Sequence, residues 1–420
     1  MRLEDPITYF VEKFAKGSQL PLRLQLWNGR RIDLSPDPNI TVTLPRPEAA
    51  QYLLSPSLAR LGEAYVEGHI LVEGSVWEII RLGEALSRQG AASNRRKPWR
   101  PFTHSRSRDA EAIRYHYDVS NDFYKLWLDR HMAYSCAYFK TGSEDIHLAQ
   151  EQKFDHICRK LLLQPGERFL DIGCGWGGLL CWAAKHYGVE ATGITLSRNQ
   201  FEHATAKIHE EGLSDRCQVL LCDYRDLPGE GCYDKIASVG MFEHVGEKNL
   251  PLYFGAAHRL LKEGGLMLNH GIATSESNSS AHDVGGGEFI ARYVFPYGET
   301  PTLGVVVREM GIQGLEAMDV ESLRPHYAQT LMHWVSRLEA NKEAAYELAG
   351  AKRYRIWQIY MAGCAHAFEQ GWVSVYQLLA SKRKAGLPAL PWSREYIYNP
   401  QAATDQVSLQ RPEVTVSPAP

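Results

Sequence analysis

One stretch decides the fold: Arg168-Phe-Leu-Asp-Ile-Gly-Cys-Gly-Trp-Gly-Gly178. Its apolar part, Phe169 to Ile172, predicts a buried strand, and the residues from Leu179 to Lys185 predict a helix that stops at Gly188. Glycines at x-G-x-G-x-x-G spacing join the two. Because glycine has no Cβ, such a turn lets backbone N–H groups approach a ligand closely. The stretch therefore predicts the binding site of a nucleotide-like cofactor.

The residues around the glycine turn favour one such cofactor over another. A dinucleotide needs an acid at the end of the next strand, where it holds a ribose hydroxyl. That strand is expected at 190–195; Glu190 lies at its start, whereas its end reads Thr195-Leu-Ser. The acid beside the turn is instead Asp171, which can orient a ligand amine but would repel a pyrophosphate. S-adenosylmethionine has no phosphate and carries an ammonium and a sulfonium group. We therefore expect S-adenosylmethionine, with a dinucleotide or a purely structural turn as the alternatives.

The composition is that of a globular protein with a large core. The chain has 420 residues, enough for two domains, and 44% of them are hydrophobic. The net charge of −3 argues against a nucleic-acid-binding protein with a dominant basic surface. The eight cysteines include no C-x-x-C pair, so we expect core thiols in a reducing compartment and no metal site. The chain shows no signal pattern and no apolar run of about 18 residues, which predicts a cytoplasmic protein.

The order of the expected elements predicts an α/β fold with a small domain ahead of it. Residues 1–90 combine short alternating strands with helices, which is typical of a small α+β domain. In the large domain, residues 111–395, strands and helices alternate and predict a doubly wound, mostly parallel sheet with ligands at the carboxyl strand ends. Its strands are expected at 168–172, 190–195, 217–223, 233–240, 265–272 and 372–379. Residues 273–330 are expected to interrupt this domain, and residues 399–420 to form a disordered tail.

Residues 91–110 predict a linker with strong positive charge. Four basic residues between 95 and 100 lie beside Trp99, and no acid occurs from 91 until Asp109. Such a run is usually a solvated linker. Mixed with aromatic side chains, it can also bind anionic lipid head groups. The sequence leaves both interpretations open.

Two segments outside the glycine turn carry candidate ligands of the cofactor. Tyr134-Ser135-Cys136 lies ahead of the alternating region and can fold back as a lid on the cofactor. Asp223 and Tyr224 end the third expected strand, where Asp223 can accept a hydrogen bond from an adenine amino group.

Two further segments suggest the site of the chemistry. Glu243 follows the fourth expected strand in apolar company, where a carboxylate is costly unless it has a function or an ion-pair partner. Residues 289–298 are apolar and aromatic without a regular period. They suit the wall of a long apolar pocket, or alternatively packing beneath a loop.

Together these segments resemble the cyclopropane fatty acid synthases. The resemblance covers roughly residues 5–385, is shared with the mycolic acid cyclopropane synthases, and implies a seven-stranded Rossmann-like methyltransferase sheet behind a lipid-docking domain at 1–90. Six motifs carry it in order: His116-Tyr-Asp-Val-Ser-Asn-Asp-Phe-Tyr, Tyr134-Ser-Cys-Ala-Tyr-Phe, Leu170-Asp-Ile-Gly-Cys-Gly-Trp-Gly-Gly, Thr195-Leu-Ser-Arg-Asn-Gln, Phe242-Glu-His-Val-Gly and Tyr327-Ala-Gln-Thr-Leu-Met.

The resemblance implies a reaction on a membrane phospholipid. A methyl group of S-adenosylmethionine is added to a cis double bond of an acyl chain, and bound bicarbonate then removes a proton as a cyclopropane ring closes. Because two neighbouring anions repel, Glu243 and bicarbonate are expected to share a proton while His270 offsets charge. The implied bicarbonate pocket consists of Cys136, Glu243, His270, Ile272 and Tyr327.

The resemblance also implies the cofactor contacts and the partners. Besides Asp171, the residues around S-adenosylmethionine are expected to be Tyr134, Ser135, Gly173, Gly175, Thr195, Leu196, Gln200, Asp223 and Tyr224. Asp223-Tyr224 departs from the Trp-Glu of the mycolic acid branch. The expected partners are the phospholipid and the anionic inner surface of the membrane, with no nucleic acid; a homodimer stays open.

Three alternatives remain on the sequence. A relative that leaves a methylene or methyl branch without closing a ring would keep most of these residues. A lipid-binding or regulatory protein without catalysis is disfavoured by intact Glu243, His270 and Tyr327. A dinucleotide-dependent reductase is disfavoured by Thr195, where such an enzyme needs an acid.

Overall fold

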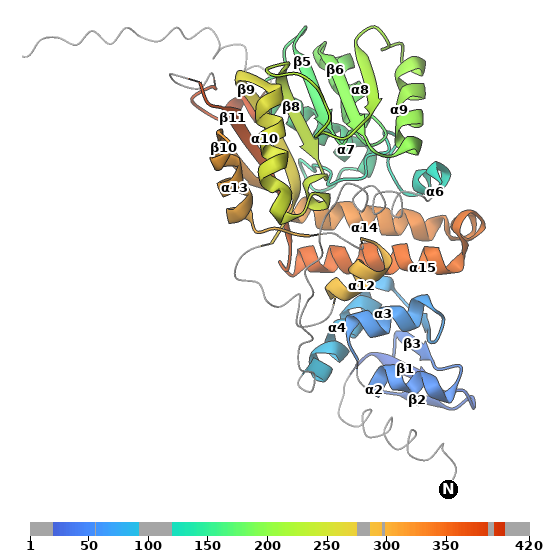
Figure 1. The fold of residues 1–420 in the computed structure, drawn as a ribbon. Helices are drawn as coiled ribbons and strands as arrows, with labels where there is room; N and C mark the ends of the chain where they lie inside the picture. The colour runs from blue at the N-terminus through green and yellow to red at the C-terminus, as the bar shows by residue number, and fades with distance from the viewer. Residues whose placement is uncertain are drawn as a thin grey trace, which may run out of the picture.

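The computed structural model describes residues 20–54, 56–91, 120–274, 286–295, 299–384 and 390–399. The basic linker from 92 on, residues 116–119 of the His116 motif, and the predicted tail from 400 on lie outside these ranges. Figure 1 shows the described residues as two units, with a pair of long helices between them.

The N-terminal unit is a four-stranded sheet covered by helices. The strands run in the order β2-β1-β3-β4, and the alternating leucines of β1 are buried as their period predicted. They are β1 Leu22–Gln25, β2 Arg31–Asp33, β3 Ile40–Thr43 and β4 Leu71–Glu73. The helices are η1 Pro47–Ala50, α2 Gln51–Leu54, α3 Leu58–Val66 and α4 Val76–Ala91. The small α+β domain predicted from the sequence is confirmed in the described part of this unit.

The large unit is built on a seven-stranded sheet in the order β10-β11-β9-β8-β5-β6-β7. The five strands from β9 to β7 pair in parallel, whereas β11 is antiparallel to both β9 and β10. The strands are β5 Arg168–Ile172, β6 Glu190–Thr195, β7 Cys217–Leu221, β8 Tyr233–Val239, β9 Leu261–Ala273, β10 Leu315–Ser322 and β11 Ser374–Lys382. The predicted fold class, a mostly parallel doubly wound sheet, is confirmed.

Helices flank this sheet, and local sequence sets where they begin and end. Asp145 caps α7 by accepting hydrogen bonds from the backbone N–H groups of its first turn, and Ser197 caps α9 in the same way. The helix after the glycine turn ends at Gly188, which has the left-handed conformation that its position requires. The helices are α6 Asn121–Lys125, α7 Ile146–Lys160, α8 Gly178–Tyr187, α9 Arg198–Glu210, η2 Phe242–His244, η3 Glu247–Asn249, α10 Leu250–Leu260, α12 Gly286–Tyr293, α13 Leu303–Ile312, α14 Arg324–Ala340, α15 Lys342–Glu369 and α16 Glu395–Tyr398.

One strand of the sheet lies where the sequence predicted only an insertion. β10 and the helix before it, α13, both fall within 273–330, so the interruption of the fold is shorter than predicted. β10 is an edge strand, and of its residues only Leu315 is buried. Since most of this strand does not face the core, it lacks the apolar pattern by which the other strands were recognised.

The predicted pocket wall at 289–298 is in its first part a helix that contacts the N-terminal unit. A Cβ added to Gly62 of α3 would lie 2.8 Å from the ring of Phe289, so the two surfaces are in close contact. Arg292 forms an ion pair with Glu63 at 2.8 Å. This part therefore packs against the N-terminal unit, and its role as a pocket wall stays a prediction; residues 296–298 are outside the described ranges. Phe295, just after the helix, does reach the large unit, where its ring centroid lies 5.3 Å from that of His244.

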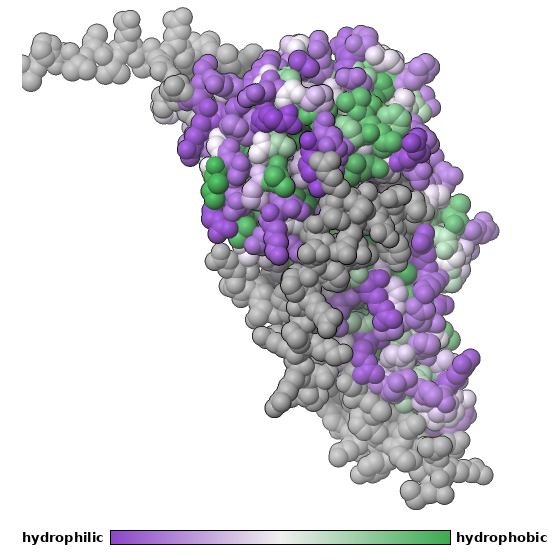
Figure 2. Space-filling view, in the orientation of Figure 1, coloured by the Kyte–Doolittle hydropathy of each residue, from purple (hydrophilic) through white to green (hydrophobic). Residues whose placement is uncertain are grey.

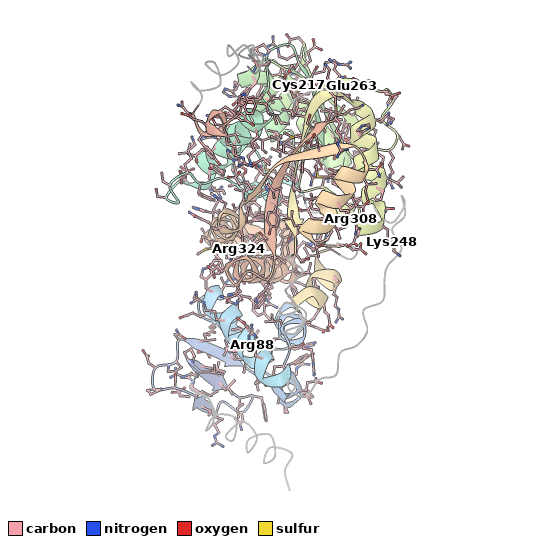
Figure 3. All side chains as sticks on the ribbon, turned by 90° about the vertical axis from the view of Figure 1, so that its left-hand side faces the viewer. Arg88, Cys217, Lys248, Glu263, Arg308 and Arg324 are labelled. Atoms are coloured by element: carbon pink, nitrogen blue, oxygen red, sulfur yellow. The ribbon has the colours of Figure 1, made fainter. Side chains whose placement is uncertain are left out.

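The helix pair α14 and α15 joins the two units. Figure 3 shows the same order from the side, with Arg324 at the start of α14 between the sheet and the helix that carries Arg88. Buried aromatic residues of this pair form one core cluster with α6 and the segment before α7. Hydrophilic residues cover much of the face in Figure 2. Within the described ranges, no helix has the length and apolar character needed to cross a membrane.

Candidate functional site

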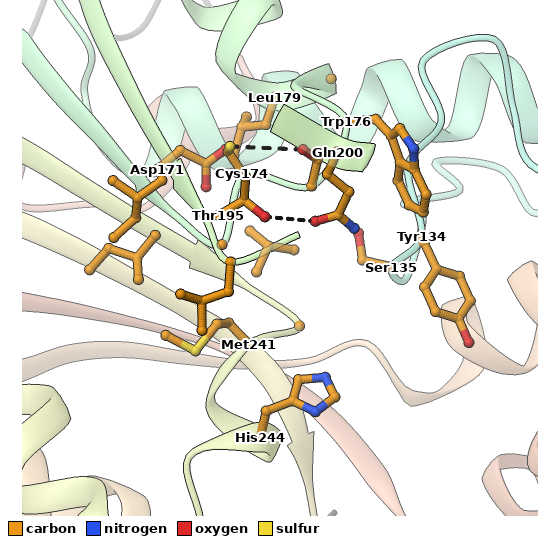
Figure 4. Close-up of a pocket in the computed structure, with 18 of the residues that line it drawn as sticks. Tyr134, Ser135, Asp171, Cys174, Trp176, Leu179, Thr195, Gln200, Met241 and His244 are labelled. Carbon is orange, nitrogen blue, oxygen red and sulfur yellow. Dashed lines mark hydrogen bonds between the residues drawn. The ribbon is translucent and has the colours of Figure 1, made fainter. Parts of the chain in front are cut away.

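A cavity opens at the carboxyl ends of β5, β6, β7 and β8, as expected for a sheet of this topology. The segment ahead of α7 covers it from the other side, so Tyr134 and Ser135 face the glycine turn (Figure 4). All of the predicted cofactor residues line this cavity: Tyr134, Ser135, Asp171, Gly173, Gly175, Thr195, Leu196, Gln200, Asp223 and Tyr224. The structure thus brings together residues from four separate segments of the chain: 134–135, 171–175, 195–200 and 223–224.

The glycine turn is held in place by its neighbours. The backbone N–H groups of Gly173 and Cys174 both donate to the carbonyl oxygen of Ile194, each at 3.0 Å. The indole N–H of Trp176 donates to Asn121 at 2.8 Å and ties the turn to α6. Gly173 has φ +80°, and a Cβ there would lie 2.9 Å from the side chain of Met241. The turn is therefore fixed by the sheet, and it has room for glycine only at this position.

The end of β6 presents hydroxyl and amide groups to the cavity. The hydroxyl of Thr195 donates to the side-chain oxygen of Gln200 at 2.8 Å and accepts from the backbone N–H of Ser197 at 3.1 Å (Figure 4). No carboxylate of β6 lies at this end of the strand, because Glu190 lies at the other. The arrangement therefore lacks the acid that would bind a dinucleotide ribose.

Asp223 already has a strong partner inside the protein. Its carboxylate accepts two hydrogen bonds from the guanidinium of Arg225, at 2.8 and 2.6 Å. Arg225 in turn lies 5.3 Å from the ring centroid of Tyr224. A carboxylate has further lone pairs, so the predicted hydrogen bond from an adenine amino group stays a prediction that must accommodate Arg225.

Lys153 of α7 is a cavity residue that the sequence interpretation missed. Its side chain is almost fully buried, and Nζ donates to the hydroxyl of Ser135 at 2.8 Å. Burial lowers the pKa of Lys153 to about 8 and raises that of Asp171, which also lines the cavity, to about 7. The signal was present: Lys153 shares the apolar face of α7 with Ala149 and Ile157, where a lysine is unexpected.

Lys153 is expected to stabilise the covering segment over the cofactor. Lys153→Met removes a charged donor to Ser135, and such a hydrogen bond is worth about 1.5–3 kcal/mol. We expect calorimetric titration to show S-adenosylhomocysteine binding weakened about tenfold or more. Lys248→Met, at an exposed lysine of η3, is the matched control and should bind like the unmodified protein. Equal affinities in both variants would remove Lys153 from the cofactor site.

The five residues predicted to hold the proton acceptor, called the enclosed cluster below, come from the segment ahead of α7, from η2, β9 and α14. Cys136, Ile272 and Tyr327 belong to one core cluster, and the backbone N–H of Ile272 donates to Oε1 of Glu243 at 2.7 Å. His270 lies two residues before Ile272 on β9 and so points to the same face of the sheet. Met241 and His244, on either side of Glu243, line the cofactor cavity. The structure thus joins Glu243 to Ile272 and places Cys136 and Tyr327 in the same core as Ile272; that all five hold one anion stays a prediction.

Two polar atoms of this cluster have no hydrogen-bond partner among the described residues. They are Oε2 of Glu243 and Nε2 of His270, and both are enclosed. Glu243 as a residue is half-buried, but its carboxyl group is not accessible. Burial raises the pKa of Glu243 to about 7, although the N–H of Ile272 opposes the shift.

The surroundings of His270 favour a neutral ring over the expected charged one. Burial holds its pKa well below 6.5, and the ammonium groups of Lys153 and Lys160 lower it further. His270 is therefore neutral at pH 7 and cannot offset a negative charge. It can still donate or accept one hydrogen bond at Nε2.

The raised pKa of Glu243 predicts a pH-dependent stability. Between pH 4.5 and about 7 the folded protein keeps a proton on Glu243 that the unfolded chain releases, so the free energy of unfolding falls as pH rises. Glu243→Gln should remove this loss, which is roughly 3 kcal/mol when complete. Thermal unfolding should then show that the stability of the variant, relative to that of the unmodified protein, increases from pH 5 to pH 8. Parallel profiles for the two proteins would contradict the raised pKa.

Aromatic rings surround the enclosed cluster. The ring of Tyr327 lies 4.7 Å from that of Phe368 and 6.1 Å from that of Trp334, and Tyr134 lies 5.3 Å from Trp334. These centroid distances are those of packed aromatic pairs. Such rings present π-faces that can stabilise a positive charge.

Comparison with known proteins identifies the family. The family model of mycolic acid cyclopropane synthetase matches residues 104–378, and a domain of unknown function matches residues 9–92. A probable fatty acid methyltransferase of Pseudomonas putida is 48% identical over 380 residues, which covers 90% of this chain and 96% of that protein. Cyclopropane mycolic acid synthase 1 of Mycobacterium tuberculosis is 37% identical over 280 residues, covering 64% of this chain and 96% of that protein.

Solved structures agree with the sequence relatives. A mycolic acid cyclopropane synthase in complex with SAH and CTAB is 36% identical and covers 65% of this chain and 98% of that one, with a TM-score of 0.61. A cyclopropane synthase from Mycobacterium tuberculosis gives the same TM-score of 0.61 at 34% identity. The match falls on the unit that contains the cavity of Figure 4. The chain therefore belongs to the mycolic acid cyclopropane synthetase family and is an S-adenosylmethionine-dependent methyltransferase that acts on lipids.

Proposed function

We propose that this enzyme converts a cis double bond in the acyl chain of a membrane phospholipid into a cyclopropane ring, with bicarbonate as the proton acceptor. The observation that carries the proposal is the pair of enclosed atoms without partners, Oε2 of Glu243 and Nε2 of His270. Leaving a buried polar group unsatisfied costs about 1–3 kcal/mol, so two such groups in one cluster favour a small polar guest.

The residues of the cluster fit a small oxyanion. Glu243 with a pKa of about 7 carries its proton for much of the time at neutral pH and can donate it in a hydrogen bond to an anion. Neutral His270 can donate from Nε2, and the hydroxyl of Tyr327 is a further donor in the same cluster. The surroundings are apolar and aromatic, which keeps the anion dry and basic.

The chemistry divides between the ligands and the protein. When bound, S-adenosylmethionine supplies the electrophilic methyl group and bicarbonate the proton acceptor. The chain itself aligns the alkene with the cofactor cavity, because an alkene is a weak nucleophile with no proton to remove and orientation is what the protein can contribute. The π electrons of the alkene form the first new C–C bond, and the bonding pair to sulfur stays on sulfur.

The same residues then complete the ring. Positive charge on the lipid chain faces the rings of Tyr134, Tyr327 and Trp334, which stabilise it and exclude water that would otherwise add to it. A C–H bond of the new methyl group breaks and its electron pair forms the second C–C bond; Glu243 and His270 would hold the ion that accepts the proton. The net change to the lipid is the gain of one CH₂.

A second candidate product is supported by the names of relatives. The relative from Pseudomonas putida is named a probable fatty acid methyltransferase, and one from Candida albicans a sphingolipid C9-methyltransferase. An enzyme of that kind would leave a methylene or a methyl branch on the chain and close no ring. It would use the same cofactor cavity, so the product decides between the two.

The direct test is the mass and structure of the lipid product. The protein is incubated with S-adenosylmethionine and vesicles of a cis-unsaturated phospholipid, and the extracted lipid is analysed by mass spectrometry and proton NMR. We expect a gain of one CH₂ and the high-field resonance of a cyclopropane methylene. A product that gains CH₂ and two more hydrogens, or one with a vinylidene resonance, would replace ring closure with the second candidate.

We further propose that the enzyme works at an anionic bilayer surface, with residues 1–90 and the basic linker as its contact. The substrate double bond lies inside a bilayer, so the protein must bind the surface before it can reach an acyl chain. Neutralising Arg95, Arg96, Lys97 and Arg100 together should reduce co-sedimentation with anionic vesicles at low salt and leave S-adenosylhomocysteine binding unchanged. If the variant still sediments like the unmodified protein, the contact lies elsewhere.

A further inference from the structure

A row of polar side chains crosses three neighbouring strands behind the enclosed cluster. Glu321 of β10 lies opposite Gln377 of β11, and Gln377 lies opposite His270 of β9. Residues opposite one another in a sheet point to the same face, so the three side chains form one line. Gln377 and His270 are fully buried. Neither Gln377 nor Glu321 was a candidate from the sequence.

Gln377 makes the one hydrogen bond that determines the state of His270. Nε2 of Gln377 lies 3.2 Å from Nδ1 of His270, and both side chains are buried. When the amide N–H donates, Nδ1 must be the acceptor, and a neutral imidazole then carries its proton on Nε2. Nε2 is the atom that has no partner among the described residues. The proton of His270 would therefore point into the enclosed cluster.

The far end of the row carries a negative charge on Glu321. The carboxylate of Glu321 accepts from Nε2 of His156 at 2.7 Å and from Nζ of Lys160 at 2.5 Å. Burial alone would raise the pKa of Glu321, but these two hydrogen bonds lower it to about 2, so it stays an anion. Both donors bond to Oε2 of Glu321, and Oε1 of Gln377 is buried without a hydrogen-bond partner among the described residues. The orientation of the amide therefore rests on the contact between Nε2 of Gln377 and Nδ1 of His270.

We propose that Gln377 is a positioning residue that fixes His270 in the tautomer with its proton on Nε2, so that His270 donates to the anion of the active site and cannot act as the base. The proposal rests on the proposed function, because it assumes an anion beside His270. It assigns proton acceptance to the anion near Glu243 and leaves His270 only the task of orienting it. Partners of a histidine that fix its tautomer typically matter by about 10–100-fold.

The experiment reads the tautomer directly by nitrogen-15 NMR of the full-length protein labelled at histidine, with bicarbonate present. Of the 16 histidines, His270 is assigned as the signal that is lost in His270→Asn. The unmodified protein should show a protonated Nε2 and an unprotonated Nδ1. In Gln377→Glu the carboxylate can accept from Nδ1, so the proton should move there or the ring should become charged, and turnover should fall about 10–100-fold while S-adenosylhomocysteine still binds.

The charged surroundings of His270 make the Gln377→Glu effect specific. A new carboxylate at 377 would raise the pKa of His270 and so add a pH dependence to turnover that a merely structural change would not produce. The titratable groups whose charges act on His270 are Lys153, His156 and Lys160 of α7 and Glu321 of β10. All of these are unchanged in the variant, so the new pH dependence can be traced to position 377.

Two controls separate this proposal from the proposed function. Gln218→Glu, on an exposed glutamine of β7, should leave both spectrum and rate unchanged. Gln377→Leu, which removes the amide without adding charge, should give a mixture of tautomers. Recording the spectrum of the unmodified protein requires no turnover. The tautomer of His270 can therefore be determined even if the lipid product contains no ring. A proton on Nδ1 of His270 in the unmodified protein would overturn the role of Gln377. So would a Gln377→Glu variant with the same spectrum and turnover rate as the unmodified protein.

Discussion

Replacing Glu243 with glutamine is expected to lower turnover by about 10² or more while cofactor binding stays within about twofold of the unmodified protein. Glutamine keeps the size of the side chain and can keep the hydrogen bond from the N–H of Ile272 at Oε1. It cannot give or share a proton with an anion at Oε2, where the structure supplies no other partner. Removing a positioned proton-transfer group typically has an effect of this size.

The measurement is single-turnover methyl transfer to lipid, together with titration by S-adenosylhomocysteine. Glu247→Gln is the matched control, because Glu247 is an exposed glutamate four residues away on η3. It should have the rate of the unmodified protein. In buffer stripped of carbon dioxide, added bicarbonate should restore the turnover of the unmodified enzyme. It should not restore the turnover of Glu243→Gln. Near-normal turnover in Glu243→Gln would exclude this residue from the chemistry.

Replacing Gly173 with alanine is expected to abolish cofactor binding, with an affinity loss of about 10² or more. Two effects combine at this position. The backbone has φ +80°, which an alanine adopts at a cost of about 1–2 kcal/mol. The new Cβ would also lie 2.9 Å from the side chain of Met241, so that side chain must move into the cavity that it lines.

Gly166→Ala separates the two effects. Gly166 also has φ +80°, but a Cβ there meets nothing within 4 Å. Both variants should lose about 1–2 kcal/mol of unfolding free energy from backbone strain. Only Gly173→Ala should lose S-adenosylhomocysteine binding in calorimetric titration. Equal affinity in the two variants would show that the glycine turn does not contact the cofactor.

The cofactor site could be predicted from the sequence because its residues lie at strand ends. Parallel strands of alternating α/β segments bring their carboxyl ends to one edge of the sheet, whatever the loops between them do. Asp171, Thr195 and Asp223 each end a strand that the apolar pattern identified, and all three line the cavity. Residues that are far apart in the sequence could therefore be predicted to lie close together in the structure.

What could not be predicted depends on pairs that local patterns do not encode. β10 was missed because an edge strand buries only Leu315, and α12 because its packing partner, Gly62, lies in the other unit. The neutral state of His270 follows from burial and from Lys153 and Lys160, which belong to a helix more than a hundred positions earlier in the chain. Such electrostatic effects require the three-dimensional neighbours.

The most direct test of ring closure at Glu243 and His270 uses S-adenosylmethionine with a trideuterated methyl group. Closing the ring breaks one bond between carbon and hydrogen in the transferred methyl group, so the account predicts that the lipid product retains two of the three deuterium atoms in a cyclopropane methylene. Mass spectrometry counts the deuterium, and proton and deuterium NMR locate it. A product that retains all three deuterium atoms would contradict the account, because no proton would then have left the methyl group.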